Sequence, residues 1–170
     1  MNSSLDELDR ALLATLHENS RIGLLELSRV LGVARATVAA RLQRLEDKGV
    51  ITGYEPRIGL EAAGYGVQAF VTLEIAQGAL EDVVSVLEQI PGVLEAFATT
   101  GSGDVLCRVA AASHDDLQRM LIVLNQSRTV ARSTSVIVLS ELVGFRTLPL
   151  LSTAESQRTP KAPAYRTVRE

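Results

Sequence analysis

Apolar side chains in the first fifty residues recur every three or four positions, which is the spacing of amphipathic helices. The pattern predicts a first helix that opens at a capping box of Ser4 and Glu7, and a short second helix that stops at Gly32. A third helix is predicted over residues 34–48, closed by Gly49. Three helices with a tight glycine turn between the second and the third outline a helix-turn-helix.

The second half of the chain changes to short strands and two further helices. Strands are predicted at residues 67–75, 93–99, 104–111 and 133–143, and helices at 79–89 and 113–125. The order β-α-β-β-α-β is that of a ferredoxin-like sandwich, in which two helices cover one face of an antiparallel sheet. The other face then needs a cover, and a second copy of the same sheet would provide one.

These elements define the expected fold class and its boundaries. We expect an α+β protein, with an N-terminal three-helix helix-turn-helix (winged-helix-like) domain followed by a βαββαβ ferredoxin-like sandwich domain. The predicted segments are the helical domain at 1–53, an extended linker at 54–66, the sandwich at 67–148 and a disordered tail at 149–170. The tail is rich in Ser, Thr, Pro and Arg without an apolar period, and its basic residues either contact phosphates or remain solvated.

Composition places the chain among ordinary globular proteins. Its 170 residues are 46% hydrophobic and 22% charged, and no run of about eighteen apolar residues offers a transmembrane helix. The polar, acidic start is unlike a secretory signal, and a single cysteine, Cys107, suits a reducing compartment. We therefore expect a cytoplasmic protein without an internal disulfide.

The net charge of −3 is distributed unevenly along the chain. Residues 1–58 carry eight basic and eight acidic side chains, whereas residues 59–150 carry five and ten. Any affinity for nucleic acid must therefore depend on where the basic residues of the first domain lie.

The basic residues of the third predicted helix form one stripe. At 100° per residue, Val38, Leu42 and Leu45 share an apolar face, and the polar, basic stripe lies about a quarter turn away. With a further arginine near the helix start, this gives the predicted DNA-binding residues Arg35, Thr37, Arg41, Arg44 and Lys48. The planar fork of an arginine can grip a guanine edge or bridge phosphates. A solvated basic face is the alternative, but the glycine turn before the helix favours DNA binding.

Residues typical of catalysis or metal binding are scattered. His17 and His114 lack Cys or acidic partners at metal-ligand spacing, and Cys107 lies in a predicted strand with no His to activate it. The sequence has no phosphate-binding glycine motif and no nucleophile elbow. It therefore predicts no enzyme, no metal site and no cofactor.

A string of motifs runs through the first domain. It consists of Leu8-Asp9-Arg10-Ala11-Leu12-Leu13, Arg21-Ile22, Glu26-Leu27-Ser28, Gly32-Val33, Arg41-Leu42-Gln43-Arg44-Leu45-Glu46 and Gly49-Val50-Ile51-Thr52-Gly53-Tyr54. This string closely resembles the Lrp/AsnC family of feast-or-famine regulators. The likeness continues through the sandwich and the loop from Gly101 to Asp104, and it covers about residues 5–148.

The resemblance implies an assembly and an effector site. Members of the family pair their sheets into dimers, commonly associate further into rings of eight, and bind an amino acid where dimers meet. The matching positions here are Thr99, Thr100, Gly101, Ser102, Gly103 and Asp104 in one loop, with Ser133, Thr134 and Ser135 in the last strand. Glycines let backbone N–H groups approach a carboxylate, and an Asp can receive an ammonium group.

Two observations leave the effector open. The glycines of this loop could serve a plain hairpin turn alone. Family members often have Gly-Asp-x-Asp here, whereas this chain has Gly101-Ser102-Gly103-Asp104. Without the first acidic residue, the effector could be another metabolite, or the chain could bind no ligand.

The expected function is a sequence-specific DNA-binding transcription regulator. Its C-terminal domain is expected to form a homodimer or a higher assembly such as an octamer, and to respond to an amino acid or a similar small metabolite. One alternative is an architectural protein that wraps double-stranded DNA with little sequence preference. The other is a sensing module that regulates an enzyme by contact.

Overall fold

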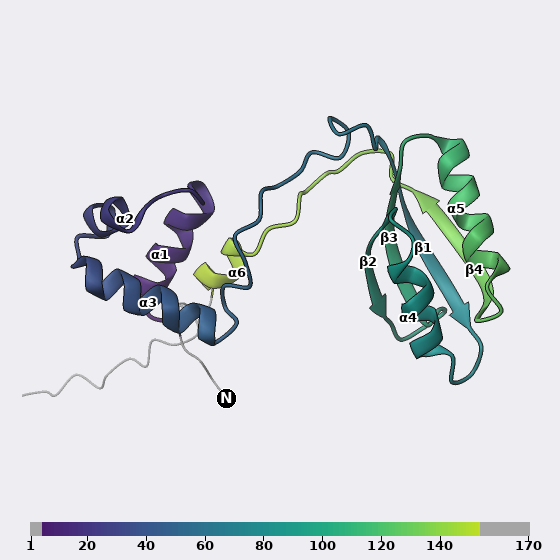
Figure 1. The fold of residues 1–170 in the computed structure, drawn as a ribbon, viewed down its shortest axis with the longest axis horizontal. Helices are drawn as coiled ribbons and strands as arrows, with labels where there is room; N and C mark the ends of the chain where they lie inside the picture. Colours follow the sequence, from purple (N-terminus) through teal and green to yellow (C-terminus); the bar gives the residue numbers. More distant parts are fainter. Residues whose placement is uncertain (1–4, 154–170) are drawn as a thin grey trace, which may run out of the picture. The chain divides into compact units, whose positions relative to one another are not determined.

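A computed structural model describes residues 5–153 of the chain, which form two compact units. One unit contains residues up to Pro56 together with the segment that begins at Gly144, and the other runs from Arg57 to Val143. The first unit is helical and the second contains all the strands among the described residues (Figure 1).

The helical unit is built on α1 (Glu7–Glu18), α2 (Leu24–Leu31) and α3 (Arg35–Asp47). The three helices enclose a small core whose central side chains are at most 1% exposed: Leu12, Leu27, Val38 and Leu45. Gly32 ends α2 in the left-handed conformation at φ 65°, which a glycine adopts without a steric penalty. The predicted three-helix arrangement with a glycine turn is therefore confirmed.

Two features of the helical unit differ from the sequence prediction. The capping box of α1 is made by Asp6 and Asp9, whose carboxylates each accept from the other's backbone N–H at 2.9–3.0 Å; Ser4 lies outside the described residues. A short helix α6 (Leu148–Thr153) starts one residue before the segment predicted to be disordered, and it contacts α1. The rest of the predicted tail, from residue 154, lies outside the described residues.

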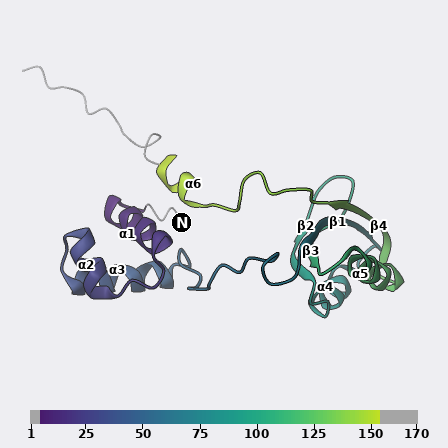
Figure 2. The same cartoon turned by 90° about the horizontal axis from the view of Figure 1, so that it is seen from above.

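The second unit is a four-stranded antiparallel sheet with the order β2-β3-β1-β4. Its elements are β1 (Val67–Ile75), α4 (Leu80–Glu88), β2 (Val93–Ala98), β3 (Val105–Ala111), α5 (His114–Gln126) and β4 (Val130–Ile137). Both helices lie on the same face of the sheet (Figures 1 and 2). The core between the helices and the sheet contains alternate residues of the central strands, such as Val71 and Cys107. The predicted ferredoxin-like sandwich is therefore confirmed.

The last strand is shorter and earlier than predicted. It was expected over residues 133–143, but it pairs with β1 only over 130–137, and Val138 donates one more bond to Gln68. β1 begins at Val67, so the chain beyond Val138 has no strand of the sheet left to pair with. Residues 138–147 are irregular, and they expose Leu139, Leu142 and Phe145 almost fully.

The face of the sheet without helices exposes large apolar side chains. Phe70 and Val136 are cross-strand neighbours on this face and are 44% and 64% exposed, and Phe97 on β2 is 54% exposed. Exposed apolar side chains of this size on one face of a sheet are uncommon in a monomeric protein. Separately, none of the helices of residues 5–153 is long and apolar enough to cross a membrane.

Candidate nucleic-acid interface and effector site

An ion-pair cluster joins α3 to the start of α1. The carboxylate of Asp9 has no exposed surface, although Asp9 lies in the first turn of a helix. It accepts hydrogen bonds from Arg41 Nη1 at 3.0 Å and from Arg44 Nη2, while Arg41 also pairs with Asp6. The side chains of Arg41 and Arg44 are 30% and 38% exposed. We call these four residues the Asp–Arg cluster.

The charges of the Asp–Arg cluster stabilise one another. The hydrogen bond from Arg41 lowers the pKa of Asp6 below its usual value of 3.8. Burial by itself would raise the pKa of Asp9, but the hydrogen bonds from Arg44, from the backbone of Asp6 and from Arg41 outweigh it and lower this pKa. The same bonds raise the pKa of Arg41. Asp6, Asp9 and Arg41 are therefore charged at neutral pH.

This cluster makes the stability of the helical unit sensitive to acid. The two carboxylates have folded-state pKa values below 3.8, so their contribution to the free energy of unfolding is fully present well above that pH. It is lost as pH falls through 3.8 toward the folded-state values, because the unfolded chain then binds protons more readily. We expect the protection factors of amides in α1 and α3, which are corrected for the intrinsic pH dependence of exchange, to fall below about pH 4. In the Asp9→Asn variant the fall between neutral and acid pH should be smaller; an equal fall would contradict this origin.

The Asp–Arg cluster includes two residues of the predicted basic stripe. The sequence predicted Arg41 and Arg44 as free cations on a DNA-binding face, whereas the structure pairs both with acidic residues of α1 or its cap. Arg35, Thr37 and Lys48 are exposed. Their role in DNA binding, like that of the two paired arginines, stays a prediction.

Sequence analysis missed the side of α3 that faces away from the core. Ala36, Ala40 and Gln43 are exposed there, opposite the buried Val38 and Leu45. Selecting residues by positive charge passed over these positions. The periodicity alone could have found them, because they lie about half a turn from the apolar face.

The chain leaving α3 is tied back to that helix. The hydroxyl of Tyr54 donates to Glu46 Oε1 at 2.8 Å. Burial first, and the adjacent carboxylate second, raise the pKa of Tyr54 to about 12.

The predicted effector loop joins β2 to β3 and is partly closed on itself. Thr99 donates through its N–H to the Asp104 carbonyl at 2.8 Å and through its hydroxyl to the Gly103 carbonyl at 2.9 Å. Gly101 and Ser102 are exposed at the tip, where Gly101 adopts φ 122°. The exposed tip leaves backbone N–H groups accessible to an anionic ligand.

The acidic residue of this loop already has a structural partner. Asp104 Oδ2 accepts from the backbone N–H of Ile75 at 2.8 Å, at the irregular end of β1. Its second carboxylate oxygen has no hydrogen-bond partner among the described residues. The carboxylate of Asp104 therefore ties the loop to β1 and also places a negative charge at the loop.

The three predicted hydroxyl residues of β4 lie on two different faces of the sheet. Thr134 pairs with Thr72 on the face without helices, whereas Ser133 and Ser135 pair with the buried Leu73 and Val71. The Thr72 methyl also lies against the loop, because a Cβ at Gly103 would be 2.1 Å from it. The loop, Thr72 and Thr134 are thus brought together, while Ser133 and Ser135 point to the opposite side. Sequence analysis missed Thr72, since only the strand register places it there.

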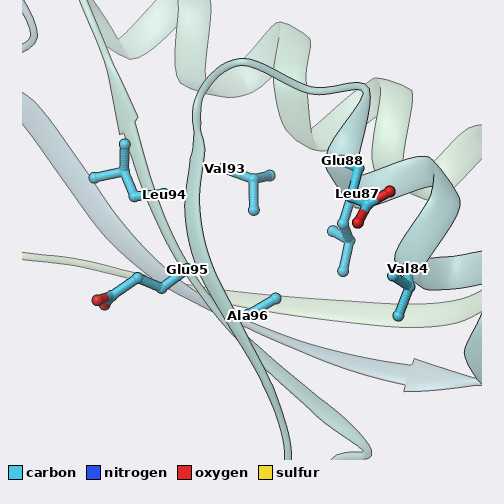
Figure 3. A pocket seen from close by; sticks show the side chains of 7 residues that line it. All are labelled: Val84, Leu87, Glu88, Val93, Leu94, Glu95 and Ala96. Atoms are coloured by element: carbon cyan, nitrogen blue, oxygen red, sulfur yellow. The ribbon is translucent and has the colours of Figure 1, made fainter. Parts of the chain in front are cut away.

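One pocket of the sandwich lies apart from the effector loop. A pocket of about 300 Å³ lies between α4 and β2, with Val84, Leu87 and Val93 at its wall (Figure 3). It contains none of the predicted effector residues, and its polar side chains, Glu88 and Glu95, would repel a carboxylate. Within residues 5–153, no three His, Cys, Asp or Glu side chains gather closely enough to hold a metal ion.

The environment of the lone cysteine does not favour a reactive thiolate. Cys107 is fully buried in β3, and this burial raises the pKa of its thiol to about 11. The thiolate that a nucleophile requires is therefore strongly disfavoured at neutral pH.

Comparison with known proteins agrees with both units. The sequence profile of a winged helix-turn-helix DNA-binding domain matches residues 5–52, and that of the Lrp/AsnC ligand binding domain matches residues 68–148. Regulatory protein AsnC of Escherichia coli is 30% identical over 149 residues, which are 86% of this chain and 97% of AsnC.

Solved structures show the same fold at similar identity. Transcriptional regulator NMB0573 of Neisseria meningitidis, in complex with L-Met, is 30% identical with a TM-score of 0.80, covering 86% of this chain and 97% of that chain. A feast or famine regulatory protein of Mycobacterium tuberculosis complexed with L-methionine is 31% identical with a TM-score of 0.76, covering 85% and 98%.

A helix-turn-helix unit joined to a ligand-binding sandwich defines a class of DNA-binding transcription regulators, not of enzymes. Within that class, the chain belongs to the Lrp/AsnC family.

Proposed function

We propose that this regulator binds particular DNA sequences through α3 and changes that binding in response to an amino acid. The observation that carries the proposal is the exposed outer face of α3, which follows the left-handed turn at Gly32. A helix presented in this way by a preceding short helix can enter the major groove. Because Arg41 and Arg44 are paired with acidic residues, we assign the sequence preference to other side chains of α3.

The loop from Thr99 to Asp104 is the proposed effector site. Exposed N–H groups near Gly101 suit a carboxylate, and the second oxygen of Asp104 suits an ammonium group. Thr72 and Thr134 add hydroxyl groups on the same face of the sheet. Complexes of two relatives with L-methionine support an amino acid as the ligand class.

We further propose that the sandwich forms a homodimer through the face without helices. Phe70, Phe97 and Val136 expose apolar surface on this face, and a second copy would remove it from water. The association of dimers into a larger ring of eight also stays a proposal. Sedimentation velocity of the full chain tests both, and a monomer at micromolar concentration would contradict them.

The function is tested on the full chain by two measurements. Selection from random duplexes should enrich one motif, and calorimetric titration with the twenty L-amino acids should give heat with at least one of them. Equal binding to all duplexes would favour DNA wrapping without sequence preference. Absence of heat with every amino acid would remove the proposed effector class but not the DNA-binding unit.

Asp104→Asn is expected to weaken effector binding about tenfold or more while leaving the fold intact. The amide oxygen can still accept from the Ile75 N–H, but the charge that would receive an ammonium group is lost. The matched control is Asp115→Asn, which removes an exposed carboxylate from the first turn of α5. Calorimetry with the amino acid that binds the unmodified chain measures both. Equal affinity in the two variants would place the effector elsewhere.

A further inference from the structure

From residue 36 to residue 43 the outward face of α3 carries no charged side chain, and the exposed Asp47 lies on the same face one turn further along. Taking Val38 as the centre of the buried face, Ala36, Ala40 and Gln43 lie roughly 140–200° away at 100° per residue. All three are exposed. From residue 36 to residue 43 the helix rises by roughly 10 Å, which is the length of about three base pairs.

The two central arginines of α3 do not lie on this outward face. In the same projection Arg41 lies about 60° and Arg44 about 120° from Val38. Both are bonded to the carboxylate of Asp9, which has no exposed surface. Turning Arg41 and Arg44 to bases would leave this carboxylate buried without a cation. Arg35, at the helix start, is exposed, but it lies nearer the buried face than the outward one.

Gln43 is then the polar side chain best placed to meet a base edge. Its Nε2 donates one hydrogen to Asp47 Oδ1 at 2.9 Å, one turn further along the helix. The second N–H and the Oε1 acceptor have no hydrogen-bond partner within residues 5–153. One donor and one acceptor on a planar amide match the N7 and N6–H₂ groups that adenine presents in the major groove.

We propose that Gln43 is a specificity-determining residue that reads an adenine, and that Arg41 and Arg44 position α3 without reading bases. This inference rests on the proposed DNA-binding function. Ala36 and Ala40 have no hydrogen-bonding side chains, and their small size lets the helix approach the groove closely enough for Gln43 to reach a base. Asp47 orients the amide before DNA is bound.

The test compares the base preferences of full-length variants at every position of the motif selected by the unmodified chain. Gln43→Ala should bind that motif about 5- to 150-fold more weakly and lose its preference for adenine at one position. Its affinity for random duplex should stay within about twofold, because no phosphate contact is removed. Gln118→Ala, which removes an exposed glutamine side chain from α5 of the sandwich, is the matched control and should retain the preference for adenine.

Variants of the arginines test the second half of the inference. Arg41→Gln and Arg44→Gln should weaken binding to all sequences by the same factor and leave the relative base preferences unchanged. Arg41→Lys should recover part of the lost affinity, because it restores a cation to Asp9. Loss of a guanine preference in either glutamine variant would overturn the assignment.

The outcomes separate this inference from the proposed function. If the unmodified chain selects no motif, the proposed sequence-specific function fails. If it selects a motif and Gln43→Ala keeps every base preference, the function stands and the role of Gln43 is wrong.

Discussion

Asp9→Asn is expected to lower the free energy of unfolding of the helical unit by about 2–4 kcal/mol. The amide is nearly isosteric with the carboxylate, so the packing of α1 on α3 is kept while one charge is removed. Arg41 and Arg44 then share a neutral partner at a position with no exposed surface. Breaking a fully buried ion pair costs more, but these arginines are 30% and 38% exposed and recover some hydration.

Amide exchange of the full chain measures this loss in the peptides of α1 and α3. A change of 2–4 kcal/mol corresponds to roughly 30- to 900-fold faster exchange of the slowest amides. Glu7→Gln removes an exposed carboxylate from the same turn of α1 and should change stability by less than about 1 kcal/mol. If the two variants exchange alike, the Asp–Arg cluster does not hold α3 in place.

Local periodicity was sufficient to predict both units, because each element of the core buries a regular stripe of its own residues. The apolar stripes that include Leu12 in α1 and Leu27 in α2 predicted these two helices. The β-branched and aromatic residues of β1 predicted the strand. The end of β4 could not be predicted in this way. The apolar residues after Ile137 resemble a strand, but a strand also requires a partner, and β1 does not extend far enough to supply it.

The contacts at the candidate sites also could not be predicted from local periodicity alone. A helical projection places Arg41 and Arg44 on a polar side of α3, but it does not show which element lies opposite. One signal was present, since Asp9 lies only about 60° from the buried Leu12 on α1 and a buried carboxylate needs a cation. At the effector loop, the grouping of Thr72 with Thr134 depends on the β1–β4 register, which pairs residues about sixty positions apart.

Gly92→Ala is expected to destabilise the sandwich by about 2–3 kcal/mol through overpacking. Gly92 lies in the turn between α4 and β2, where its carbonyl accepts from the Ala110 N–H at 2.8 Å. An added Cβ would be 2.0 Å from Met120 Cε and 2.8 Å from the Ala110 carbonyl oxygen. The methionine can adopt another rotamer, but the carbonyl belongs to β3 and can move only with the strand.

Gly66→Ala is the matched control, because a Cβ there would meet only Glu61 Cγ at an ordinary 3.9 Å. It should be neutral or stabilise the chain by up to about 1 kcal/mol, since alanine reduces the freedom of the unfolded chain. Amide exchange in β3 and α5 compares the two variants. Adding Met120→Ala to Gly92→Ala removes one of the two clashes and leaves the backbone one, so exchange in β3 should stay faster than in Met120→Ala alone. If the double variant is as protected in β3 as Met120→Ala alone, the clash with the Met120 side chain excludes alanine at position 92, and the clash with the Ala110 carbonyl does not. The turn would then accept a Cβ once the Met120 side chain is shortened.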